Sequence, residues 1–203
     1  MIAEVLIVSR TRMKNGVCVG GVDIHAAQNR FVRLHDEDNS NLTESAPYQI
    51  GEVWRLDLLR PWNPRPRPHV EDRMVLSAEK LSTYDMSCMK DTLLGLDVPI
   101  YRGPIEELFE KKLVLDENTP FVGAMDVPQN SVCFWLPDAP LFLHSHYNNR
   151  VYFRYKNSKI AYVGFQKPQS LVSGELLRMS LANWWKKEGV DEERCYLQLS
   201  GWY

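Results

Sequence analysis

The chain has 203 residues, of which 44% are hydrophobic and 25% are charged, and its formal net charge is −2 at pH 7. A chain of this length can bury a core without disulfides or metals, as one large β domain or, as we favour, two small ones. The balanced charge argues against a protein that coats nucleic acid through a global positive field, although local groups of cations remain able to bind it.

No apolar run in the sequence approaches the roughly 18 residues of a membrane span, so no membrane insertion is expected. The first ten residues carry an early acid and no basic stretch ahead of their apolar run, which is typical of a strand rather than a secretory signal. The expected location is therefore the cytoplasm.

The cysteines stand far apart and lack the close spacing of zinc ligands or of a disulfide scaffold. Reduced and mostly buried thiols are the favoured interpretation, with a spatial cysteine cluster as the alternative. No metal and no other cofactor is expected. The four residues are Cys18, Cys88, Cys133 and Cys195.

The first part of the chain contains five strand candidates. Apolar and β-branched residues at 2–10 and 17–24 flank turn-forming residues at 14–16, which predicts an opening hairpin. Gly20 and Gly21 inside the second candidate indicate a bulge where a small barrel bends. The remaining candidates are residues 30–34, 51–58 and 69–76.

A proline-rich connection follows the fourth candidate strand. Residues 60–68 include four prolines and cannot donate a regular ladder of hydrogen bonds, so they are expected to be extended. Arg65 and Arg67 would then lie on an irregular loop. This loop is either an arm that contacts nucleic acid or a stiff connector whose arginines are solvated.

The middle of the chain changes from strand to helix patterns. Ser82 and Asp85 are spaced as in a capping box, and apolar residues recur at helical spacing until Gly95, which predicts a helix. A second short helix is expected to begin with Pro104 in its first turn. Residues 78–112 are therefore interpreted as a helical connector.

Strand patterns return after residue 113. One short helix is also expected at residues 181–187, because Leu181, Trp184 and Trp185 fall at helical spacing, and core packing is the favoured role of Trp184. The candidate strands are residues 131–136, 141–144, 150–156, 159–165, 175–179 and 195–200.

The most informative of these segments is the hairpin formed by residues 150–156 and 159–165, with a turn at residues 157–158. Strand alternation places an aromatic ring among cations on one of its faces. Such a face can stack bases and hold phosphates, whereas the plainer interpretation is an ordinary sheet with solvated side chains. The residues concerned are Tyr152, Arg154, Lys156 and Lys159.

Two groups of residues suggest other chemistry. In an extended segment His69 and Glu71 share one side, so with Asp72 they can serve acid–base chemistry, although a structural polar network is favoured. His144 and His146 also share a face, but two ligands do not make a convincing zinc site.

Five motifs in order resemble the dual OB domain-containing proteins of prokaryotes; they are residues 16–21, 31–34, 50–54, 68–72 and 193–203. The resemblance implies a mainly β chain with short helices, in which two OB-like barrels follow in tandem. The first would comprise residues 1–77, and the second residues 113–203, joined by the helical connector at 78–112. It also implies nucleic-acid binding, often in defence against mobile elements, and supplies no catalytic residue.

These observations favour a noncatalytic module that binds single-stranded or structured DNA or RNA. One alternative is a protein-interaction or ligand-sensing adaptor for a partner enzyme, such as a defence enzyme. A weaker alternative is a small hydrolase centred on His69, Glu71 and Asp72. The nucleic-acid contacts of the leading hypothesis are Arg65, Arg67, Tyr152, Arg154, Lys156 and Lys159, with Tyr152 stacking on a base.

Overall fold

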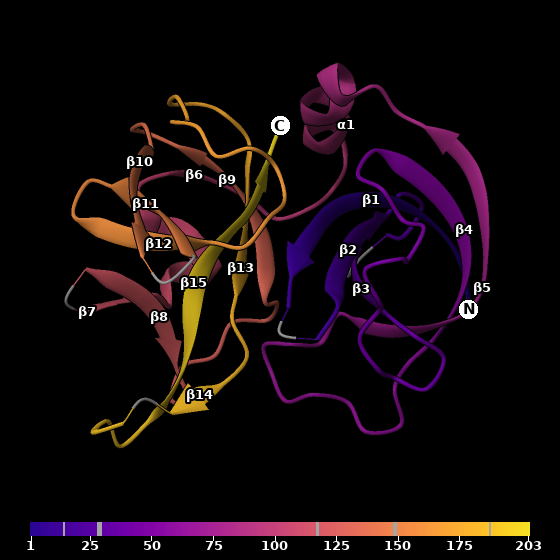
Figure 1. Cartoon of the computed structure of the whole chain (residues 1–203), viewed down its shortest axis with the longest axis horizontal. Coiled ribbons are helices and arrows are strands. Elements are labelled where there is room, and N and C mark those ends of the chain that lie inside the picture. The colour runs from indigo at the N-terminus through magenta and orange to yellow at the C-terminus, as the bar shows by residue number, and fades with distance from the viewer. Residues whose placement is uncertain (14, 28–29, 117, 148–149, 187) are drawn as a thin grey trace. The chain divides into compact units, whose positions relative to one another are not determined.

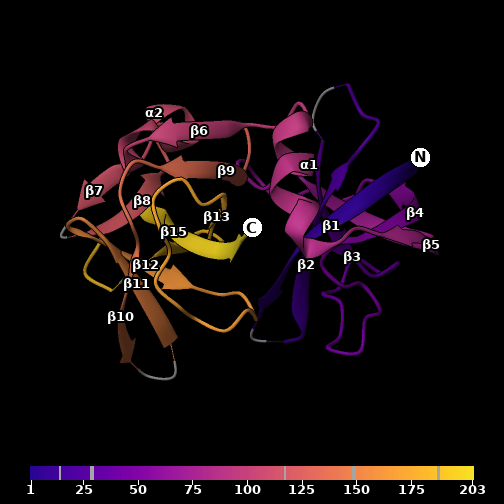
Figure 2. The same cartoon turned by 90° about the horizontal axis from the view of Figure 1, so that it is seen from above.

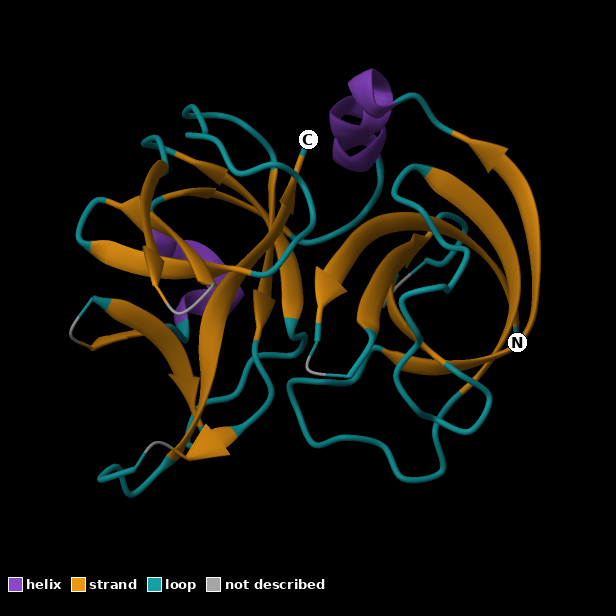
Figure 3. Cartoon of the chain, in the orientation of Figure 1, coloured by secondary structure: helices purple, strands orange, loops and turns teal. Residues whose placement is uncertain are grey.

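The computed structural model describes residues 1–13, 15–27, 30–116, 118–147, 150–186 and 188–203. The fold is mainly β with a few short helices (Figure 3), which confirms the expected fold class. Two compact units are present. Unit 1 comprises Met1–Pro66, Val70–Val98 and Tyr203, and unit 2 comprises Arg67–His69 and Pro99–Trp202.

Unit 1 is built around a closed barrel with the strand order β1-β2-β3-β5-β4 (Figure 1). β3 and β5 are parallel, and the other neighbouring strands are antiparallel. A five-stranded barrel of this kind is the architecture of the OB fold. Its strands are β1 (Ile2–Arg12), β2 (Val17–Asp23), β3 (Phe31–His35), β4 (Glu52–Leu59) and β5 (Asp72–Thr83).

Every second side chain along the strands points inward, and these side chains fill the core of unit 1. Trp54, Leu56 and Leu58 of β4 point into the barrel, as the sequence predicts, and pack there with Val5 and Ile7 of β1. The neighbouring Arg55 is exposed on the opposite face. The hydrophobic pattern therefore fixes which face of each strand is buried.

The expected irregularity near Gly20 and Gly21 lies on the opposite strand. The β1–β2 register shifts between Ile7 and Ser9, which pair with Gly21 and Gly20 respectively. A Cβ atom on Gly21 would lie 2.2 Å from Val5 Cγ1, so this position needs glycine for close approach to β1. The bulge is on β1, and the glycine provides the room for it.

The fifth strand begins later and runs further than the sequence suggested. β5 starts at Asp72 rather than at residue 69 and extends to Thr83, where it pairs with Glu52. Ser82 pairs with Val53 in this ladder, so it does not cap the following helix. Pairing with the long β4 takes residues 78–83 of the expected connector into the barrel.

The helix after β5 is capped by Asp85. Its side chain accepts a hydrogen bond from the Ser87 backbone N–H at 2.8 Å. η1 (Met86–Cys88) and α1 (Met89–Gly95) follow, and α1 buries Met89 and Leu93. No helix among the described residues is long and apolar enough to cross a membrane.

After the segment Arg67–His69, the described part of unit 2 continues with a short strand and two helical turns, followed by further strands. The second turn departs from a regular helix, because Phe109, Glu110 and Lys111 have φ values of 51°, 62° and 64°. The expected second helix is therefore a 3-10 turn, preceded by Pro104, and then a left-handed turn. Figure 2 shows where α2 lies, beside β6. These elements are β6 (Ile100–Gly103), η2 (Ile105–Glu107) and α2 (Leu108–Lys111).

The strands of unit 2 repeat the pairing order of the first barrel. β9 pairs with β13 and β10 with β11, so β9 and β10 together take the place of the first barrel strand. β11 pairs with β12, β12 is parallel to β15, and β15 pairs with β13. The strands are β7 (Val114–Asp116), β8 (Thr119–Gly123), β9 (Val132–Pro137), β10 (Phe142–Tyr147), β11 (Arg150–Tyr155), β12 (Ser158–Tyr162), β13 (Leu177–Leu181), β14 (Trp185–Lys186) and β15 (Glu193–Trp202).

The predicted helix at residues 181–187 is wrong. Leu181 ends β13, and Trp185 begins β14, which pairs with Arg194 and Glu193 of β15. This pairing with a strand later in the sequence overrides the helical spacing of the apolar residues. Trp184 packs partly against the core, and its Nε1 donates to the carbonyl oxygen of Arg67 at 2.8 Å.

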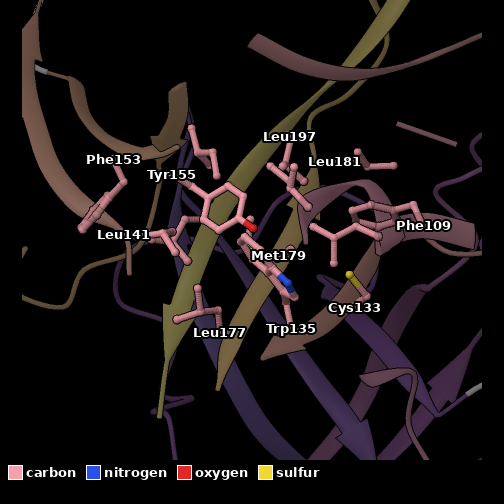
Figure 4. Packing of buried hydrophobic residues seen from close by; sticks show 14 of the residues in the cluster. Phe109, Cys133, Trp135, Leu141, Phe153, Tyr155, Leu177, Met179, Leu181 and Leu197 are labelled. Atoms are coloured by element: carbon pink, nitrogen blue, oxygen red, sulfur yellow. The ribbon is translucent and has the colours of Figure 1, made fainter. Parts of the chain in front are cut away.

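Aromatic and aliphatic side chains fill the core of unit 2. Trp135 and Tyr155 lie near its middle with a T-shaped ring contact at 4.9 Å, between Leu141 and Phe153 on one side and Phe109 on the other (Figure 4). Burial of this face leaves the alternate residues of β11, β12 and β15 pointing outward.

Candidate functional site

The outward face of the β11–β12 hairpin carries the cations and the ring that the sequence singled out. Phe153 and Tyr155 are buried, whereas Arg154 is exposed and Tyr152 is half-buried. Tyr155 pairs with Ser158, so the turn consists of residues 156–157 rather than 157–158. The left-handed φ of 49° at Lys156 takes this residue out of the strand.

A cavity of about 640 Å³ opens on the outward face of β11, β12 and β15. Its walls combine cations with aromatic rings, and none of the described residues that line it is acidic. The lining residues are Thr119, Arg150, Tyr152, Lys159, Ala161, Ala182, Trp185, Arg194, Tyr196, Leu197 and Gln198.

The cations of this cavity lie close to aromatic rings. Lys159 Nζ lies 4.0 Å from the centroid of the Tyr152 ring, and the Arg194 guanidinium lies 4.0 Å from that of Phe121. Arg194 Nη2 also lies 3.2 Å from a carboxylate oxygen of Glu192, which neutralises part of its charge. Lys159 therefore contributes more uncompensated charge than Arg194.

A second cavity of about 370 Å³ adjoins the first, because both are lined by Thr119 and Lys159. Arg154 and Lys159 are cross-strand partners, so their two charges lie side by side along this surface. We call the two cavities together the unit 2 groove. The other residues of the second cavity are Asn118, His144, Lys156 and Asn157.

The cations of the groove differ in how far carboxylates compensate them. Lys156 Nζ lies 2.8 Å from Asp138 Oδ2, and this hydrogen bond raises the pKa of Lys156. Within the described ranges, Arg150, Arg154 and Lys159 form no ion pair with a carboxylate. These three side chains are the ones available to an anionic ligand.

Arg65 and Arg67 of the proline-rich loop are placed elsewhere. Arg65 lies in unit 1, where its Nε is 3.4 Å from Asp72 Oδ2. Arg67 lies in unit 2 and accepts the hydrogen bond from Trp184 through its backbone carbonyl. Neither residue lines the described part of the groove.

Asp72 is the centre of a buried polar cluster in unit 1. Its carboxylate accepts from Arg33 Nε and lies 3.2 Å from His35 Nε2. Burial alone would raise the pKa of Asp72, but the hydrogen bond with His35 and the charge of Arg33 outweigh it and hold this pKa well below its ordinary value. Glu71 is also buried, and its carbonyl oxygen accepts from the Arg33 backbone N–H at 2.8 Å.

Neither His69 nor Glu71 lies in a strand, because β5 begins at Asp72. His69 belongs to unit 2, where its Nε2 lies 3.7 Å from the Cys195 sulfur. Burial raises the pKa of Cys195 to about 12, so this thiol is neutral at pH 7. The expectation that His69 and Glu71 lie in one strand is corrected, because the strand begins only at Asp72.

Nothing in the described structure assembles a metal site around the histidines or cysteines. No group of three or more His, Cys, Asp or Glu side chains in the described ranges is placed to hold a metal ion. His144 lines the second cavity, whereas the side chain of His146 lies outside the described part of the chain.

Sequence reasoning missed the half of the groove that β14 and β15 supply. Arg194, Tyr196 and Gln198 alternate with the buried Cys195, Leu197 and Leu199 along β15. This alternation is visible in the sequence, but the parallel pairing of β15 with β12 is not. Interpreting residues 181–187 as a helix also concealed Trp185.

Comparison with known proteins matches this chain to a protein family and to solved structures. A family model described as the dual OB-containing domain matches residues 3–202. A murine DNA-binding protein solved with double-stranded DNA is 12% identical, with a TM-score of 0.31 over 98% of this chain and 91% of that chain. No curated protein matches the sequence.

Proposed function

The chain belongs to the dual OB-containing domain family, and from this premise we propose that unit 2 binds single-stranded or otherwise unpaired nucleic acid along its groove. The five-stranded OB barrel commonly uses the face of its second and third strands for oligonucleotides. In unit 2 these strands correspond to β11 and β12, which supply Tyr152, Arg154 and Lys159.

The observation that carries this proposal is the composition of the groove. Its larger cavity joins three cations with Tyr152, Trp185 and Tyr196 and has no acidic residue among its described lining. Cations attract phosphates, and aromatic faces stack on bases of any sequence. A groove with both features suits a nucleic-acid strand better than an acidic peptide, which would use the cations and leave the rings without a partner.

The aromatic side chains favour an unpaired strand over a regular duplex. Bases in a duplex are stacked on their neighbours, so their faces are not open to protein side chains. Trp185 is 55% exposed and Tyr152 is half-buried beside Lys159, so ring surface is available in the groove. The proposed ligand is therefore single-stranded DNA or RNA, or an unpaired region of a structured molecule.

The proposal is tested by fluorescence anisotropy with labelled single-stranded DNA, single-stranded RNA and duplex DNA, using protein stripped of co-purified nucleic acid. Reversing two groove charges with Arg154→Glu and Lys159→Glu is expected to weaken single-strand binding at least tenfold. The reason is that two attractive phosphate contacts become repulsive.

A matched control separates the groove from the overall charge. Arg102→Glu with Lys111→Glu changes the net charge by the same amount at exposed positions that do not line the groove. This variant is expected to bind within about threefold of the unaltered protein. Equal weakening by both pairs of substitutions, or no binding by the unaltered protein, would remove the groove from consideration.

We extend the proposal to the biological setting that the family resemblance implies. The module would act in the cytoplasm of a prokaryote, in defence against mobile elements and beside a partner enzyme. Phage plaque formation on a native host tests this role. The groove variant is expected to lose protection that the matched control retains, and equal protection by both would contradict the link to nucleic-acid binding.

A further inference from the structure

The barrel of unit 1 and the sheet of unit 2 differ in one row of cross-strand partners. In unit 1 the row crosses the second, third and fifth strands, β2, β3 and β5. In unit 1 this row is Gly20, Arg33 and Asp72. Arg33 and Asp72 are ion-paired there, and the Arg33 side chain is only 15% exposed. The row in unit 1 is therefore filled by its own side chains.

In unit 2 the corresponding strands β11, β12 and β15 carry the row Tyr152, Ala161 and Gln198. The small side chain of Ala161 stands between two longer ones, and all three line the larger cavity together with a second alanine, Ala182. The methyl groups leave space that longer side chains would occupy. The hollow in unit 2 thus follows from alanine at the middle of this row.

The size of this hollow suits a compact ligand. Its volume of about 640 Å³ lies within the usual range of about 300–1,000 Å³ for small-molecule sites. A flat surface that only coats a strand does not require such a volume. The larger cavity can therefore enclose one building block of the strand rather than only its backbone.

The walls of the cavity match the parts of a nucleotide. Trp185 offers an exposed ring, with the Tyr196 ring at 6.0 Å between centroids. Gln198 and Thr119 provide polar groups that can hydrogen-bond a base edge. Arg150 and Lys159 are placed for the phosphate. The face of the base, the edge of the base and the phosphate thus each have a partner of suitable chemistry.

We propose that the larger cavity receives one unpaired nucleotide, with its base against Trp185 and over Ala161 and its phosphate at Lys159. The cations of the smaller cavity then bind the flanking backbone. This inference rests on the proposed function and deepens it, because it predicts a preference for an extruded nucleotide over an uninterrupted duplex.

The test compares a blunt hairpin duplex with the same duplex carrying a single-nucleotide bulge, both labelled for anisotropy. A single-stranded 12-mer of the same polymer is measured in parallel. The unaltered protein is expected to bind the bulged duplex about tenfold more tightly than the blunt one, which matches the contribution of one stacked base. Equal affinity for the two duplexes would overturn the inference.

Ala161→Phe fills the floor of the cavity, and Ala161→Ser is its matched control. The phenylalanine variant is expected to lose the preference for the bulge while it keeps salt-dependent binding to the 12-mer; the serine variant keeps both. Trp185→Ala removes the exposed wall without altering the core, and it serves if Ala161→Phe does not fold.

The outcomes separate the inference from the proposed function. A bulge preference that survives both Ala161→Phe and Trp185→Ala overturns the nucleotide cavity but leaves strand binding intact. Failure of the unaltered protein to bind the 12-mer and both duplexes overturns the proposed function itself.

Discussion

The buried carboxylate of Asp72 is surrounded by basic side chains of unit 1. Arg33, His35 and Arg65 all lie within ion-pairing distance of it, so three side chains from β3 and the proline-rich loop converge on the first residue of β5. Removal of one partner from a buried charge pair leaves the other uncompensated, which is costly. This carboxylate therefore fixes the start of β5 against β3.

Replacement of this carboxylate tests its role. Asp72→Asn is expected to lower the free energy of unfolding by about 3 kcal/mol at pH 7, because it leaves Arg33 without its charged partner. Urea denaturation measures the difference. Glu79→Gln, which breaks an ion pair whose carboxylate side chain is 65% exposed, is the control and should change stability by less than about 1 kcal/mol.

The lowered pKa of Asp72 also predicts how stability depends on pH. Because the pKa is depressed in the folded state, its stabilisation is present above the ordinary value of 3.8 and is lost as the pH falls below it. Urea unfolding of the unaltered protein between pH 7 and pH 3 should therefore show a loss in the acid range. Asp72→Asn should flatten this loss, and an unchanged pH profile would contradict the assignment.

At the scale of single elements, backbone conformation decides where particular residues are tolerated. β1 and β2 approach closely at Gly21, and α2 holds Phe109, Glu110 and Lys111 in the left-handed region. At Gly21 a Cβ atom is excluded because it would contact β1. In α2 the residues carry Cβ atoms, and the left-handed conformation therefore has a conformational cost. Alanine and glycine substitutions should consequently act in opposite directions at the two sites.

Gly21→Ala is expected to destabilise unit 1 by about 1–3 kcal/mol, because the new methyl group would lie 2.2 Å from Val5 Cγ1 in a packed core. Urea denaturation followed by circular dichroism measures this change. Gly95→Ala at the end of α1 meets nothing within 4 Å and is the matched control. Equal stability of both variants would show that the barrel relaxes at no cost.

Lys111→Gly is expected to raise the free energy of unfolding of unit 2 by up to about 1 kcal/mol, because glycine adopts a left-handed φ without strain. The ion pair with Glu107 that it removes is exposed and contributes little. Thermal unfolding measures the gain. Lys111→Ala loses the same ion pair but keeps the strain, so it should give no gain.

Sequence patterns predict pairing between strands that are close in the sequence, but they do not predict pairing between strands that are far apart in it. The β11–β12 hairpin is local, so alternation alone placed Tyr152 and Arg154 on its outward face. The remainder of the groove depends on β15, whose parallel pairing with β12 joins residues 37 positions apart, as Ala161 and Gln198 show. Propensity does not determine such a pairing, and β14 was mistaken for a helix for the same reason.

Across the whole molecule, the net charge of −2 contrasts with the local composition of the groove. Electrostatic binding depends on the cations near the phosphates and only weakly on distant charges, because salt screens charges beyond about 10 Å. The overall charge therefore does not decide whether unit 2 binds an anionic ligand. Short sequence motifs predict the family and the fold, whereas the grouping of cations in the groove is visible only in the structure.

If the cations of the groove determine binding, their number predicts how the affinity depends on salt concentration. Three uncompensated cations in the groove correspond to a slope of about −2 for the logarithm of the affinity against the logarithm of salt concentration, at about −0.7 per single-strand phosphate contact. Anisotropy titrations at several salt concentrations measure it. A much steeper slope would mean that further cations take part beyond Arg150, Arg154 and Lys159.

The membership of Arg67–His69 in unit 2 has a consequence for synthesis on the ribosome. Two partners of this segment lie far along the chain: Trp184 follows Arg67 by 117 residues, and Cys195 follows His69 by 126. At elongation rates of about 5–20 residues per second, the segment waits on the order of ten seconds before either partner emerges. The strands of the first barrel can pair during this interval, so docking of Arg67–His69 becomes one of the last steps in the maturation of unit 2.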